Sequence, residues 1–403
     1  MADPLRVRMC GPLEPYSHGF AAELSRQGYT RVSAAFQLQL MAHLSHWLAK
    51  EGLDCRGLTP AMVEAFLTRR RTIGYTNYCS PKALGPLLRY LRGLDVTPPP
   101  SPDVPQTPVE VLLKGYWRYL TVERGLTTST VRAYVDMVRP FLIGRASTDG
   151  LGLEHLTPGD VTAFVLAECS RRSRCSAKLM VTALRSLLGY LHVGGVLEKS
   201  LQAAVPSVAG WRLSGLPRAL ETEQVRRLLH SCDRRTMVGR RDFAILTVLA
   251  RLGLRAGEAA GLELDDIDWR AGEVVIHGKG NRQEGLPLPT DVGEAVAAYL
   301  RRGRSHSAQG REVFLRVRAP HRRLTSSGVT QIVAAAGRRA GLGKLGAHRL
   351  RHTAATELLR AGAPLVEVGQ VLRHRGLLTT AIYAKVDRES LRILARTWPV
   401  CAS

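Results

Sequence analysis

The sequence predicts a mainly helical protein with a small β-hairpin in its last segment, where helices and strands form an α+β domain. Two observations support this class. Leucine-rich segments of helical character fill most of the chain, and stretches rich in Pro and Gly separate them. The stretch 273–289 instead begins with the β-branched run EVVIH, continues through a Gly-Lys-Gly-Asn turn and ends in a second extended run.

Two boundaries divide the 403 residues, which are too many for one ordinary domain. The stretch TPPPSPDVPQTP at 97–108 has six prolines in twelve residues, which excludes a helix or a central strand. A weaker boundary runs through AAVPSVAGWRLSGLP at 203–217. We predict a helical bundle at 1–96, a linker at 97–107, a second helical domain at 108–200, a linker at 201–215 and a mixed domain at 216–403.

The two helical segments resemble each other in order and spacing. GYT at 28–30 is echoed by GLT at 125–127, LTPAMVEAFL at 58–67 by LTPGDVTAFV at 156–165, and LLRYLRGLDV at 87–96 by LLGYLHVGGV at 187–196. In each LTP the Thr suits the N-cap of a helix and the Pro its first turn. We interpret 1–96 as a duplicate of 108–200; a chance match between leucine-rich helices is the alternative.

Each copy also carries a basic stretch before its last helix. TRRRTIGYTNYCSPK at 68–82 and CSRRSRCSAK at 169–178 occupy the same place in the two segments. A charged run is usually only a solvated surface, but its recurrence favours contact with phosphate groups. We expect both stretches to be loops.

The elements of the last segment follow from periodicity. We expect a helix at 220–232, a longer and largely buried helix at 241–254, then the hairpin, and helices around 291–302, 327–340, 349–361, 364–373 and 378–396.

Composition restricts the kind of partner. Lys and Arg total 57 against 34 for Asp and Glu, a formal net charge of +23, and 216–403 alone holds 32 basic and 18 acidic residues, or +14. This surplus favours a polyanion, first nucleic acid and second an anionic membrane. Apolar runs stay short of the ~18 residues of a membrane span, and the seven cysteines form no CxxC. We therefore expect a cytoplasmic protein with reduced cysteines and no membrane anchor.

The stretch GAHRLRHTAATELL at 346–359 concentrates charge at the start of a predicted helix. At 3.6 residues per turn His348, Arg351 and His352 share one face, whereas Arg349 points elsewhere. Two imidazoles and a guanidinium repel one another when charged. This face therefore needs either an anion or neutral histidines.

Three more places carry polar residues that packing alone would not select. Arg255 closes a largely apolar helix and is followed three residues later by Glu258, so the two form an ion pair, await a ligand, or do both. Lys279 lies at the tip of the hairpin, and His374 precedes Tyr383 by nine residues. Each signal is weak alone, because exposed lysines and half-buried tyrosines are common.

Taken together, these residues resemble the tyrosine recombinases, the phage integrase family. GLRAGEAAGLELDDID resembles the family's first box, GKGNRQEGLPLP its lysine hairpin and HRLRHTAATELL its second box. VLRHRGLLTTAIYAKV resembles the last box, where the family commonly has Leu-Gly-His. The resemblance covers about 216–398 and, more weakly, 108–200, which is similar to the family's core-binding domain. It implies a tyrosine-recombinase-like catalytic domain, and leaves the first bundle without a role.

The resemblance also implies a mechanism. Tyr383 would attack a DNA phosphate and form a covalent 3′-phosphotyrosyl link, leaving a 5′-hydroxyl. Arg255 and Arg351 would grip the non-bridging oxygens. The remaining roles are His348 as base, Lys279 as acid, His374 as a hydrogen-bond partner of the phosphate, and His352 as a brace of its helix. No cofactor or metal is expected, because the covalent link conserves the energy of the phosphodiester.

The implied partner is double-stranded DNA, with a homotetramer on synapsed DNA and other recombinases of the same mobile element as further candidates. Two alternatives to recombination stay open. A monomeric topoisomerase-like enzyme shares this chemistry, although the spacing is that of recombinases. A DNA-binding protein without catalysis is disfavoured because all six catalytic positions are filled.

Overall fold

The structure is a computed structural model of the whole chain, and we describe the residues 7–99, 107–147, 150–209, 219–278, 283–305, 308, 310–373, 380 and 383. Within these ranges no helix has the length and apolar character needed to cross a bilayer. Backbone contacts divide the chain into two compact units, Ser101–Ser214 and the remainder, Met1–Pro100 with Gly215–Ser403. The described residues hold separate apolar cores for the first bundle, the second bundle and the last segment.

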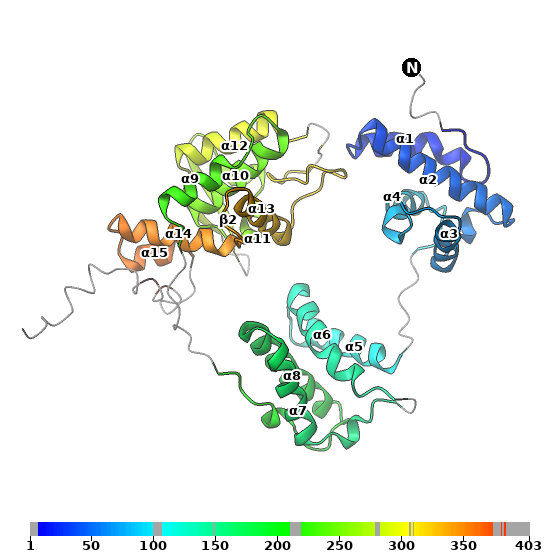
Figure 1. The fold of residues 1–403 in the computed structure, drawn as a ribbon, viewed down its shortest axis with the longest axis horizontal. Coiled ribbons are helices and arrows are strands. Elements are labelled where there is room, and N and C mark those ends of the chain that lie inside the picture. The colour runs from blue at the N-terminus through cyan, green and yellow to red at the C-terminus, as the bar shows by residue number, and fades with distance from the viewer. Residues whose placement is uncertain are drawn as a thin grey trace, which may run out of the picture. The chain divides into compact units, whose positions relative to one another are not determined.

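The first bundle contains four α-helices, and capping side chains set the starts of the second and third. Thr30 and Thr59 are N-caps whose hydroxyls accept hydrogen bonds from the amides of Ser33 and Met62, and Pro60 takes the first helical position as predicted. The helices are α1 (Ser17–Arg26), α2 (Arg31–Lys50), α3 (Pro60–Thr72) and α4 (Pro81–Gly93), seen together in Figure 1.

The second bundle repeats this arrangement. Thr157 and Asp160 form a capping box at the start of the third helix, where Pro158 takes the first helical position. Its helices are α5 (Pro108–Arg118), α6 (Thr128–Ile143), α7 (Pro158–Arg171) and α8 (Arg174–Val193) (Figure 1).

Equivalent positions are buried in the two bundles. The buried leucines of α4 recur in α8 at a shift of 100 residues: Leu84, Leu87, Leu88 and Leu91 against Leu184, Leu187, Leu188 and Leu191. A close helix contact recurs as well, because a Cβ on Gly19 would overlap the Tyr90 hydroxyl and one on Gly115 would lie 2.6 Å from the Tyr190 hydroxyl. The bundles thus share element order and buried positions, as the proposed duplication requires. The five-part division itself stays a prediction.

The expectation that both basic stretches are loops holds for residues 73–80 of the first stretch and is wrong for most of the basic residues. Arg69, Arg70 and Arg71 lie in the last turns of α3, and the second stretch begins in α7 and ends in α8. Arginine favours helices, and cations are stabilised near a helix C-terminus, so the arginines prolong these helices.

The last segment is an α+β domain, which confirms the predicted class. The hairpin strands β2 (Glu273–His277) and β3 (Gln283–Pro287) pair in register from Glu273↔Pro287 to His277↔Gln283, and β1 (Ile267–Asp268) adds a third antiparallel strand in the order β1-β2-β3. The predicted helix 378–396 lies almost wholly outside the described residues. The other helices are α9 (Thr222–His230), α10 (Met237–Leu252), α11 (Ala256–Gly261), α12 (Thr290–Arg302), α13 (Ser326–Arg339), α14 (Ala347–Arg360) and α15 (Leu365–Val371).

Helix α10 is the central element of this domain. It packs against both α12 and α14, and eleven of its sixteen residues are buried. It ends at Gly253, whose φ of +60° is the left-handed conformation that glycine adopts without strain. A Cβ there would approach the Leu372 side chain to 2.8 Å. Glycine is therefore required both for the turn and for the close approach of the chain around residue 372.

The glycine–tyrosine contact of the second bundle gives a test of its packing. Gly115→Ala should loosen α5 and α8, because the new methyl group overlaps the Tyr190 hydroxyl, and overpacking of this kind costs about 1–3 kcal/mol. Tyr190→Phe removes the overlapping oxygen, so Gly115→Ala should cost much less in that background. Hydrogen exchange of the α5 and α8 amides measures both effects. Equal loss of protection in the two backgrounds would contradict the contact.

Candidate active site

Arg255 is held by Glu258 at the start of a helix of its own. It is not at the end of α10, as expected, but is the N-cap of the short α11, because Gly253 has already ended α10. Its backbone amide donates to Glu258 Oε2 at 2.8 Å and its Nη1 donates to Oε1 at 2.5 Å. The predicted i, i+3 ion pair is therefore present. The Arg255 side chain keeps 45% of its surface exposed, so it can also reach a ligand.

Arg351 is buried and bound to backbone carbonyls. Its Nη1 donates to the carbonyl of Gly253 at 2.7 Å, and its Nη2 donates to the carbonyl of Leu372. These oxygens lie just past the ends of α10 and α15, where helix carbonyls carry partial negative charge. Burial, and then the neighbouring Arg255 and Arg373, lower the pKa of Arg351 to about 10, so it remains a cation at neutral pH.

Arg373 is a third guanidinium that the sequence analysis missed. Only 8% of its surface is exposed, and its Nη2 donates to Glu258 Oε2 at 3.0 Å. Its own carbonyl accepts a hydrogen bond from Arg255 Nη2 at 3.3 Å. Its φ of +54° lies in the left-handed region, which costs a non-glycine residue about 1 kcal/mol. Arg373, which follows Glu258 by 115 residues in the sequence, thus lies in the same ion-pair cluster as Arg255 and Glu258.

The predicted face of α14 carries the two histidines and connects them to the tyrosine. The rings of His348 and His352 are 4.4 Å apart, edge to face. His352 Nδ1 lies 2.7 Å from the Tyr383 hydroxyl, so the helix brace expected of His352 is in fact a direct partner of the phenol. The spacing of four residues does indicate that His352 shares a helix face with His348. The sequence does not show that Tyr383 lies beside that face.

Burial keeps this part of the site uncharged. It raises the pKa of Tyr383, which is 1% exposed, to about 12, although Arg351 acts in the opposite direction. It lowers the pKa of His352 to about 4, with His348 and Arg351 adding to the effect. The pKa of His348 is lowered too, by burial and then by Arg351 and Arg255. The face therefore carries neutral histidines. This is one of the two arrangements, with a bound anion as the other, that avoid repulsion between its cationic side chains.

The structure thus brings together four of the six predicted site residues, Arg255, His348, Arg351 and Tyr383. Lys279 and His374 lie outside the described residues. The strands that flank Lys279 do form the predicted hairpin. In the described part of the site, three guanidiniums are hydrogen-bonded to or lie near one carboxylate, Glu258, and Glu284 also acts on Arg373, which leaves a cluster with a net positive charge suited to an anion.

Comparison with known proteins shows which family the chain belongs to. Residues 218–390 match the model of the phage integrase family, and residues 113–193 match that of the phage integrase N-terminal SAM-like domain. The chain belongs to the tyrosine recombinase, or phage integrase, family. It is a site-specific recombinase that acts on DNA.

Curated relatives agree over long stretches. The chain is 42% identical over 393 residues to y4rA of Sinorhizobium fredii, named as an integrase/recombinase, a match that covers 96% of this chain and 95% of y4rA. It is 34% identical over 301 residues to the tyrosine recombinase XerD of Mycobacterium tuberculosis, covering 70% of this chain and 94% of XerD. The y4rA match is long enough to take in most of the first bundle.

Two solved structures show the fold. XerH site-specific recombinase bound to its palindromic difH substrate has a TM-score of 0.56 at 19% identity, covering 84% of this chain and 95% of XerH. A lambda integrase tetramer bound to a Holliday junction has a TM-score of 0.54 at 18% identity, covering 86% of this chain and 90% of the integrase chain.

The lowered pKa of His352 predicts a pH dependence of stability. Between pH 6.5 and about 4 the unfolded chain binds a proton at residue 352 that the folded chain does not, so folding weakens as the pH falls through this window. His352→Asn cannot become a cation, and should flatten this dependence in the hydrogen exchange of α14. His230→Asn, on an exposed part of α9, is the matched control. An unchanged slope in His352→Asn would contradict the lowered pKa.

Proposed function

We propose that the chain breaks and rejoins DNA through a covalent 3′-phosphotyrosyl intermediate formed by Tyr383. The supporting observation is the convergence of Arg255, Arg351, His348 and Tyr383 in one cluster with excess positive charge. The phosphodiester supplies the anion that this cluster lacks. Guanidiniums held by fixed carbonyl and carboxylate partners can stabilise charge on the non-bridging oxygens as phosphorus becomes five-coordinate.

The proton transfers are assigned to the remaining predicted residues. His348 is the proposed base for the Tyr383 proton, Lys279 the proposed acid for the departing 5′ oxygen, and His374 a proposed hydrogen-bond donor to the phosphate. His352 is a positioning residue in this scheme, since its Nδ1 is hydrogen-bonded to the Tyr383 hydroxyl before DNA is bound. The attack forms a phosphorus–oxygen bond to Tyr383 and breaks the bond to the 5′ oxygen, so rejoining needs no other energy source.

The nucleophile is tested by Tyr383→Phe. This variant should form no SDS-resistant adduct with a nicked half-site, because the attacking oxygen is absent, while duplex binding stays close to that of the parent. His352→Asn is the matched control, since it alters the partner of the phenol but keeps the nucleophile, and it should still form adduct. An adduct in Tyr383→Phe would place the nucleophile at another residue.

We further propose that four chains assemble on two synapsed duplexes, alone or with other recombinases of the same mobile element, in the cytoplasm where such DNA lies. The tetramer on a Holliday junction seen for lambda integrase, which shares the fold, supports this assembly. A monomeric, topoisomerase-like enzyme would need one chain on one duplex.

Mass measurement in solution separates the two assemblies. With a DNA carrying two target sites, Tyr383→Phe should form a complex of four chains that is absent with one site. This variant keeps the complex uncleaved during the measurement. One chain per duplex at saturating protein would contradict the tetramer and favour the topoisomerase-like alternative.

A further inference from the structure

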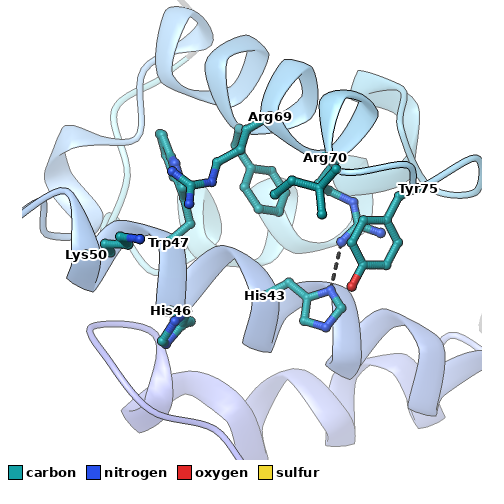
Figure 2. Close-up of a pocket in the computed structure, with 9 residues that line it drawn as sticks. His43, His46, Trp47, Lys50, Arg69, Arg70 and Tyr75 are labelled. Atoms are coloured by element: carbon teal, nitrogen blue, oxygen red, sulfur yellow. Dashed lines mark hydrogen bonds between the residues drawn. The ribbon is translucent and has the colours of Figure 1, made fainter.

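A pocket of about 270 Å³ lies in the first bundle, between α2 and the end of α3 with the loop that follows it. Figure 2 shows His43, His46 and Lys50 along α2, facing Arg69, Arg70 and Tyr75. Trp47 and Phe66 supply apolar walls. The nine lining residues include three cations, two histidines and no acid: His43, His46, Trp47, Lys50, Phe66, Arg69, Arg70, Ile73 and Tyr75.

Arg70 is the unusual member of this set. It is only 7% exposed, yet it forms no ion pair with any carboxylate in the described part of the chain. Its guanidinium lies 4.1 Å from the centre of the Tyr75 ring, and its Nη1 is 2.7 Å from His43 Nδ1. Its Nη2 donates to the carbonyl of Asn77 at 3.4 Å, and its Nε is buried without a hydrogen-bond partner among the described residues. A buried donor left unsatisfied is costly, so stability alone does not explain why a guanidinium lies at this place.

The three consecutive arginines therefore have different surroundings. Arg71 is paired with Glu64, outside the pocket, while the exposed Arg69 lies 3.4 Å from Glu51 and also lines the pocket. An exposed pair of this kind contributes little, so Arg69 can turn to an anion at small cost. His43 adds no fixed charge, because burial and the nearby Arg70 and His46 lower its pKa.

Exposed aromatic rings extend the pocket along α2. Phe36, Gln39, His43, His46 and Lys50 form one exposed stripe on this helix, with spacings of three and four residues over about 21 Å. The ring of Phe36 lies 6.2 Å from Tyr78, and that of His43 lies 5.5 Å from Tyr75. Exposed aromatic groups gathered beside cations are typical of a binding surface.

The second bundle offers an internal comparison. At the shifts of 97 and 98 residues that align the bundles, His43, His46 and Arg70 correspond to Pro140, Ile143 and Glu168. Glu168 is paired with Arg172, so that side of the second bundle has its own closed ion pair. The shared fold therefore does not require the aromatic and cationic set. A function specific to the first bundle explains it better than packing does.

We propose that this pocket binds an unpaired nucleotide of DNA, with its base against the aromatic walls and its phosphate on Lys50, Arg69 and Arg70. The excess of cations selects an anion, and the aromatic walls select a planar group. A paired base cannot stack on Tyr75, the exposed ring of the pocket, because its neighbours in the duplex cover both of its faces. The inference rests on the proposed recombination, in which bases leave one duplex before they pair in another.

The test compares single-stranded and duplex DNA on the full-length protein. Tyr75→Ala should weaken binding of a short oligothymidylate about tenfold, the scale of one lost aromatic–base stack, and change duplex binding by less than about twofold. Tyr75→Phe keeps the ring and should bind like the parent. Lys50→Ala should also weaken single-strand binding, whereas Lys82→Ala, an exposed lysine outside the pocket, should not. Because Tyr75, Lys50 and Lys82 are all exposed, these variants should fold.

Photocrosslinking with 5-iodouridine in the same oligonucleotide locates the contact. Crosslinks on the peptides that contain Trp47 or Tyr75 support the proposal. Equal losses for single strand and duplex would overturn it in favour of general phosphate contact. Loss of self-association without DNA, with oligothymidylate binding unchanged, would assign the pocket to a protein partner instead. Adduct formation by Tyr383 in these variants separates the two inferences: if it persists while the single-strand effect is absent, this proposal alone fails.

Discussion

The active site depends on one carboxylate that holds two guanidiniums from different parts of the chain. Glu258 binds Arg255 from its own helix and Arg373 from beyond α15, while Arg351 is fixed by the carbonyls of Gly253 and Leu372. One bound acid cannot neutralise three arginines, so the rest of the stabilisation comes from Glu284, which acts on Arg373 through space, and from main-chain dipoles at helix ends. Removing Glu258 would take away the carboxylate that hydrogen-bonds both Arg255 and Arg373. A phosphate that enters this cluster meets donors that are already oriented, and the oriented donors need no reorganisation during the reaction.

The sequence predicted the parts of this site that depend on local periodicity. His348, Arg351 and His352 share a face because α14 is regular, and Glu258 pairs with Arg255 because three residues form one turn. Contacts between elements that lie far apart in the sequence could not be predicted in this way. Arg373 occupies a left-handed position where the resembled family commonly has glycine, and no local pattern shows that its side chain turns back to Glu258, 115 residues earlier. Arg255 was misplaced because the apolar run of α10 hides the break at Gly253.

The two bundles show the same division between scaffold and surface. Their buried leucines and glycine–tyrosine contacts recur, because packing constrains the interior of each bundle equally. Their exposed faces differ, since no interior contact restrains them. Comparison of the two segments in the sequence identified the repeat through its buried residues and Thr-Pro caps. The same comparison assigned the basic stretches to loops, because charge alone does not distinguish a loop from a helix end. The inward turn of Arg70 and the outward pairing of Arg71 depend on which face of α3 each residue occupies.

Tyr383 and its partner His352 explain how the proposed nucleophile can remain un-ionised beside so much positive charge. Burial raises the pKa of Tyr383 and lowers that of His352, so both groups are neutral between pH values of about 4 and about 12 and their hydrogen bond persists. Burial outweighs Arg351, which alone would favour the phenolate. A bound phosphate diester would offset part of the arginine charge and favour protonation of the histidines. It would thus make the imidazoles better proton acceptors when a substrate is present to be attacked. The same phosphate would oppose a free phenolate at Tyr383, because it offsets the Arg351 charge that favours one, so the phenol proton would have to pass to an imidazole as the new bond forms.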